Sequence, residues 1–118
     1  MTKTAVQVEL VYIENEKETL RFHAVLQDGK LASPEMYCHL YELNAKNSYE
    51  VQPGILHAED GNFRRYQGEW GYDDTSDVTI EFLDRPLEVG QEITRTDKSD
   101  GLKYTSIYRI TGITDLLA

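Results

Sequence analysis

The chain has 118 residues, of which 40% are hydrophobic and 28% are charged, a composition typical of one globular domain rather than of a disordered segment. Its 21 acidic and 12 basic side chains give a formal net charge of −9, so the field of the protein repels phosphate backbones and anionic membranes. This balance argues against a nucleic-acid or membrane partner and favours a basic one.

Cysteine content and the start of the chain bear on the compartment. Cys38 is the only cysteine, which excludes an internal disulfide and gives no sign of an oxidising environment. Residues 1–16 alternate as a strand does and lack the apolar core of a secretion signal, and no stretch has the pattern of a membrane span. We therefore expect one cytoplasmic domain over residues 1–118.

Two alternating runs open the chain, and a short charged link at residues 14–18 joins them. Apolar side chains fall on one face of each run, which is the period of a half-buried strand. The two runs are therefore predicted to pair as an antiparallel hairpin, with Asp28-Gly29 as the turn that follows. The predicted inward residues are Val6, Val8, Leu10 and Tyr12 in the first run and Leu20, Phe22, Ala24 and Leu26 in the second.

Residues 34–44 are the segment for which the sequence favours a helix. Ser33 can cap a helix, Pro34 suits its first turn, and Glu35 suits the positive end of the helix dipole. The residues that would share one helical face are Met36, Leu40 and Leu43. The alternative is a strand, in which the alternating residues would be Tyr37, His39, Tyr41 and Leu43.

The rest of the chain again has the pattern of strands separated by turns. Pro53-Gly54 and Asp60-Gly61 are turn signals, and residues 78–82 alternate cleanly. A final strand is expected from about Leu102 to Ile113, with a mixed alternation that indicates either a bulge or burial of both faces. The predicted fold is α+β and mainly antiparallel β: one curved or barrel-like sheet of about six to eight strands, with one helix after the first hairpin.

Segment 57–77 gathers the only Trp of the chain, several glycines and a run of carboxylates. In a strand from about residue 62 to 72, the aromatic side chains would lie on one face. Flat aromatic side chains beside carboxylates suit a recognition surface, although the same side chains also suit a sheet core. The candidate binding residues are Tyr66, Trp70, Tyr72, Asp73, Asp74 and Asp77.

The sequence contains no strong catalytic or metal-binding motif. His23, His39 and His57 lie far apart and have neither helical spacing nor a Cys-x-x-Cys partner. Cys38 adjoins His39, but neighbouring residues point in different directions, and no nucleophile elbow or phosphate loop occurs. We therefore expect no catalytic residue, metal ligand or cofactor.

Three functions are consistent with these observations. The first is a small, acidic, soluble protein-interaction module, of the inhibitor or immunity type, in which aromatic residues anchor a basic protein partner and aspartates steer its association. The second is a β-barrel that binds a small ligand or carbohydrate, with Trp70 on the wall. The third is a metal-dependent enzyme that uses the three histidines. An unpaired edge strand would also permit a homodimer.

Overall fold

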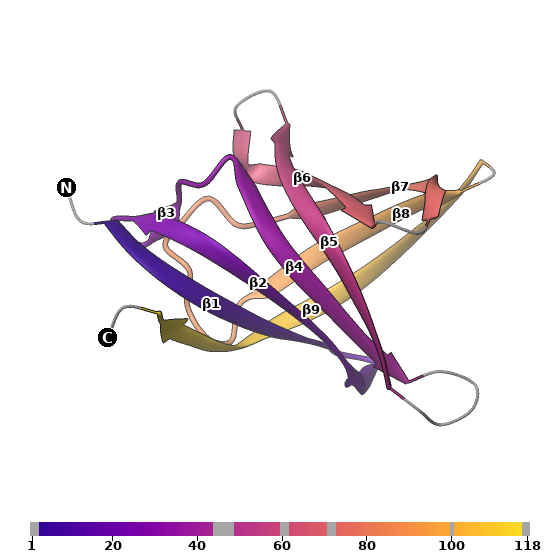
Figure 1. The fold of residues 1–118 in the computed structure, drawn as a ribbon, viewed down its shortest axis with the longest axis horizontal. Coiled ribbons are helices and arrows are strands. Elements are labelled where there is room, and N and C mark those ends of the chain that lie inside the picture. The colour runs from indigo at the N-terminus through magenta and orange to yellow at the C-terminus, as the bar shows by residue number, and fades with distance from the viewer. Residues whose placement is uncertain (1–2, 44–48, 60–61, 71–72, 100, 117–118) are drawn as a thin grey trace.

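In the computed structural model, strands follow one another around a closed antiparallel barrel (Figure 1). The structure describes residues 3–43, 49–59, 62–70, 73–99 and 101–116. Within these ranges no helix is long and apolar enough to span a bilayer. The strands are β1 (Lys3–Tyr12), β2 (Asn15–Gln27), β3 (Lys30–Leu31), β4 (Glu35–Leu43), β5 (Tyr49–Glu59), β6 (Asn62–Trp70), β7 (Asp73–Glu81), β8 (Glu92–Ser99) and β9 (Leu102–Asp115).

Pairing of the first and last strands closes the sheet. The order around the ring is β1-β9-β8-β7-β6-β5-β4-β2, and β1 pairs with β2 as well as with β9. The two-residue strand β3 is an appendage that pairs only with the end of β2 in the described part of the chain. Because β1 and β2 pair with each other to close the ring, neither of these described strands is a free edge to which a second copy could add a strand. Homodimerisation stays a prediction.

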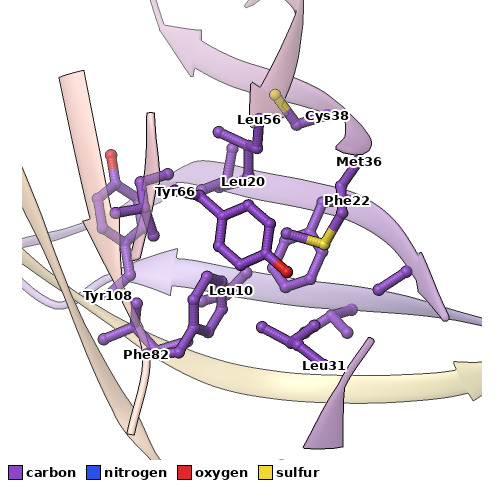
Figure 2. Packing of buried hydrophobic residues seen from close by; sticks show 14 of the residues in the cluster. Leu10, Leu20, Phe22, Leu31, Met36, Cys38, Leu56, Tyr66, Phe82 and Tyr108 are labelled. Atoms are coloured by element: carbon purple, nitrogen blue, oxygen red, sulfur yellow. The ribbon is translucent and has the colours of Figure 1, made fainter. Parts of the chain in front are cut away.

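Apolar side chains fill the interior of the barrel (Figure 2). The first hairpin packs as its alternation predicted, since Val8 lies opposite Phe22 and Leu10 opposite Leu20, all of them buried. The ring of Phe82 lies across both Phe22 and Tyr66, with ring centroids 5.5 and 5.7 Å apart and edge-to-face geometry. Eight strands make a barrel just wide enough for side chains to fill, and this one is filled.

The predicted helix over residues 34–44 is wrong, because Glu35–Leu43 is the strand β4. Met36, Cys38 and Leu40 are buried while Tyr37 between them is 69% exposed, which is a period of two. The α+β class is therefore corrected to all-β over the described residues, and the strand alternative is confirmed. Helix-capping signals are local, whereas the ring needs a strand here to join β2 to β5.

The predictions made for Ser33, for two turns and for the last strand have different outcomes. The Ser33 hydroxyl does not cap a helix; it accepts a hydrogen bond from the Val25 N–H at 3.1 Å. Asp28 and Gly29 form the predicted turn between β2 and β3, with positive φ angles of 53° and 84°. Pro53-Gly54, predicted as a turn, lies inside β5 instead. The predicted bulge in the last strand is confirmed by a shift in the β1–β9 register.

Candidate functional site

Tyr66, the first of the predicted binding residues, lies inside the barrel with no exposed surface. Its hydroxyl donates a hydrogen bond of 2.7 Å to the backbone carbonyl of Ser33, and burial raises the pKa of the phenol to about 12. The side chain is therefore a neutral core group that ties β6 to the segment before β4. It offers no exposed face to a partner.

Of the other predicted binding residues, those that the structure describes lie at the end of β6 and in β7. Trp70 ends β6 and its backbone is paired with that of Asp73, the first residue of β7. Asp74 follows in β7, and Asp77 lies opposite Lys98 of β8. Tyr72 falls outside the described residues. A recognition surface formed by these side chains stays a prediction.

The three histidines occupy separate positions on the barrel. The ring of His23 is 3.3 Å from the side chain of Gln7, and His39 is paired with Arg21 on one side and Pro53 on the other. His57 lies between two carboxylates, 3.9 Å from Glu35 and 3.4 Å from Glu69. Among the described residues, no group of three or more His, Cys, Asp or Glu side chains is placed to hold a metal ion.

A polar network inside the barrel was not predicted. Arg95 of β8 donates from Nε and Nη2 to the two carboxylate oxygens of Asp97, at 2.8 and 3.0 Å. Its Nη1 donates to the Tyr108 hydroxyl of β9 at 3.3 Å, and that hydroxyl donates to Glu18 of β2. The alternation of β8 carried the only signal for this network, since Arg95 and Asp97 continue the inward face of Ile93.

The pKa shifts in this network keep its groups in their ordinary protonation states and do not activate any of them for catalysis. Burial lowers the pKa of Arg95, but the hydrogen bond and charge of Asp97, together with Tyr108, outweigh it and raise the pKa overall. Burial, opposed by Arg95 and supported by Glu18, raises the pKa of Tyr108. Burial also raises the pKa of the nearby Cys38 thiol to about 12. The Tyr108 phenol and the Cys38 thiol therefore stay protonated near neutral pH, which does not suit a nucleophile.

A pocket of about 330 Å³ opens at the end of the barrel that carries β3. Three segments form it: β3, the beginning of β6, and the connection from β7 to β8, which lies beside β3 in Figure 1. We call it the end pocket. Its lining residues are Lys30, Leu31, Phe63, Arg64, Leu83, Asp84, Arg85 and Leu87.

Backbone hydrogen bonds hold the three segments of the end pocket together. The Leu87 N–H donates to the Gly29 carbonyl at 2.9 Å, which fixes the connection to the β2–β3 turn. The Phe82 N–H donates to the Arg64 carbonyl at 2.7 Å, which fixes the start of the same connection to β6. The two bonds lie on either side of residues 83–86, so this stretch is held at both ends.

The sequence carried only a weak signal for the end pocket. Leu83 and Leu87 flank the Asp84-Arg85-Pro86 turn. Two leucines beside a turn that is expected to be solvated are the one hint of an apolar site here. The other walls come from segments about 20 and 50 residues away, so no periodicity joins them.

Comparisons of the chain with protein-family models, with curated proteins and with solved structures give no match.

Proposed function

We propose that this protein is a barrel that binds a small molecule without transforming it, and that the end pocket is the binding site. The observation that carries the proposal is a pocket of about 330 Å³ lined by four apolar and four charged side chains. Ligand sites are typically concave, mainly apolar and roughly 300–1,000 Å³ in volume, with a small number of polar groups for orientation.

The barrel interior supports a site at the end rather than in the lumen. Small barrels either fill their interior with side chains or enclose a ligand. Here Tyr66, Phe22 and Phe82 pack against one another across the middle, and Leu10 and Leu56 are fully buried around them (Figure 2). A ligand in the lumen would have to displace this core, whereas the end pocket lies outside it.

The chemistry of the pocket lining favours binding over catalysis. None of its eight lining residues is His, Ser, Thr, Cys or Tyr, so it lacks the usual pairing of a nucleophile with a base. Its one carboxylate, Asp84, lies 3.5 Å from the Lys30 ammonium, and both side chains are more than half exposed. Such an exposed pair orients a ligand more readily than it moves a proton.

The proposal is tested by mapping ligands onto the structure with amide chemical shifts. A library with equal numbers of neutral, cationic and anionic fragments is screened against ¹⁵N-labelled protein. Hits are expected to shift the amides of residues 30–31, 63–64 and 83–87. Hits that map only around Arg95 and Tyr108, or a screen without hits, would contradict the proposal.

A matched pair of leucine substitutions controls for nonspecific binding. Leu83 lines the pocket and is 37% exposed, whereas Leu102 begins β9, is 57% exposed and is not part of the lining. Leu83→Trp fills the pocket and is expected to abolish the shifts with little change in melting temperature. Leu102→Trp adds the same indole to the surface and should leave binding intact.

A further inference from the structure

We infer that the ligand of the end pocket is a small amphipathic organic anion, free in solution, with a short apolar body and one carboxylate or sulfonate group. This inference rests on the proposed function and adds the chemical class of the ligand. It comes from two features of the same pocket: the sign of its charge and the placement of its apolar walls.

The charge of the pocket is opposite to the charge of the protein. Lys30, Arg64 and Arg85 face it, against the single carboxylate of Asp84. The whole chain has 21 acidic side chains against 12 basic ones, so three bases beside one acid reverse the local balance. Charges beyond a Debye length of about 8 Å are largely screened at physiological salt, so the nearby cations decide which ion is attracted.

Arg85 is better placed than Lys30 to hold an anion. Lys30 already has Asp84 at 3.5 Å, whereas Arg85 forms no ion pair with any other described residue. A guanidinium offers a planar fork of donors that matches a carboxylate or sulfonate. Arg85 also precedes Pro86, whose carbonyl accepts a hydrogen bond from the Gln91 side chain at 2.9 Å, so the backbone at this point is tethered.

The apolar side chains form a floor and two walls. Leu31 and Leu87 are buried, with exposures of 8% and 9%, and they make the floor. Phe63 and Leu83 come from different segments and are 40% and 37% exposed, so they present apolar surface to solvent in the same pocket. An apolar body between these walls would cover that surface, which is the usual reason for an exposed apolar patch beside a pocket.

A neighbouring hollow that shares Arg85 has the opposite balance of charge. It has a volume of about 680 Å³, is lined by residues 88–91 of the β7–β8 connection together with parts of β8 and β9, and shares Leu83 and Arg85 with the end pocket. Glu88 and Glu92 line it, so its carboxylates outnumber its one cation. The end pocket, with the reverse balance, is the site that selects for negative charge.

The class of ligand is tested with three probes that share one apolar chain: octanoate, 1-octanol and octylammonium. Each is titrated below its aggregation limit and followed by the amide shifts of residues 30–31, 63–64 and 83–87. Octanoate is expected to bind about tenfold more tightly than octanol and more tightly still than octylammonium. Its advantage over octanol should shrink as salt is raised, because charge attraction is screened.

Charge-matched variants assign the preference to Arg85. Arg85→Gln should weaken octanoate binding about five- to tenfold and leave octanol unchanged. Arg109→Gln removes the same charge from an exposed position on β9 outside the lining and should change neither probe. Equal losses in the two variants would overturn the assignment, because the whole-protein charge would then be responsible.

The two proposals fail in different ways. Equal affinity for all three probes at the mapped amides would overturn the anionic class and leave a general apolar binding site. Preferential binding of octylammonium would overturn the class as well. Absence of shifts at the pocket with every probe, together with a fragment screen that gives no hit there, would overturn the proposed function itself.

Discussion

Arg95 is a charged side chain in a mainly apolar interior, and its effect on stability depends on its polar partners. Its side chain is 15% exposed and that of Asp97 is 30% exposed, so both have lost most of their hydration. A buried ion pair roughly offsets its own desolvation cost, but removing one partner leaves a buried charge without compensation. The pair as a whole therefore adds little net stability, but loss of either side chain alone is expected to destabilise the barrel.

Substitutions at this pair should be strongly non-additive. Asp97→Asn keeps the shape, removes the charge opposite Arg95, and is expected to lower the free energy of unfolding by roughly 1–3 kcal/mol. The double variant Arg95→Met/Asp97→Leu should lose less than the sum of its single substitutions, because neither charge of the pair is left without its partner. Urea unfolding followed by circular dichroism measures all three, with exposed Asp84→Asn as a control expected to change stability by less than about 0.5 kcal/mol. Strict additivity would show that the two side chains act independently.

The β2–β3 turn is the element on which the end pocket depends most directly. Gly29 has a φ of +84°, and a Cβ atom at this position would lie 2.8 Å from Cβ of Pro86. Its carbonyl also accepts the hydrogen bond from Leu87. Glycine is therefore required twice over, once for the backbone conformation and once for the close approach of the β7–β8 connection.

Two glycine substitutions separate these requirements. Gly29→Ala meets both the unfavourable φ and Pro86, whereas Gly101→Ala has a similar φ of +76° but open space around its Cβ. We expect Gly101→Ala to cost about 1 kcal/mol of unfolding free energy and Gly29→Ala to cost at least about 1 kcal/mol more. Thermal unfolding compares them, and octanoate binding should weaken only in Gly29→Ala. Equal losses of stability would show that the connection yields without cost.

The sequence predicts most strands correctly but fails for β4, which it predicts as a helix. The period-two pattern of Val6, Val8 and Leu10 correctly predicts which face of β1 is buried, and burial of that face stabilises the strand. In β4 the capping residues pointed to a helix, but closure of the ring is a non-local requirement that no local signal contains. The end pocket escaped prediction for the same reason, because its walls meet only once the ring has closed.

Closure of the barrel also places several titratable groups where they must remain uncharged. Cys38 and Tyr66 lie in the interior, where burial raises each pKa to about 12, and burial raises the pKa of Tyr108 as well. Unfolding returns these groups to pKa values of about 9 for the thiol and 10 for the phenols. The unfolded chain therefore releases these protons at lower pH than the folded barrel does.

The consequence is a specific weakness of the barrel toward alkali. For an acid whose pKa is raised by folding, the stabilisation is fully present below the unfolded pKa and is lost as the pH rises toward the folded value. Stability should thus begin to fall near pH 9, where Cys38 would ionise on unfolding, and fall more steeply above pH 10 as the two tyrosines join. Each group adds up to about 1.4 kcal/mol of lost stability per pH unit in this window.

Tyr66→Phe isolates one of these contributions. The variant should be less stable than the parent at pH 7 by about 1–2 kcal/mol, because the Ser33 carbonyl loses its hydrogen-bond donor. Its stability should nevertheless fall less steeply between pH 10 and 11.5, so the two curves converge as the pH rises. Tyr104→Phe, on an exposed side chain of β9, should leave the slope unchanged. Urea unfolding at half-unit pH steps measures the three slopes, and parallel curves for Tyr66→Phe and the parent would show that the buried phenol does not control the alkaline loss.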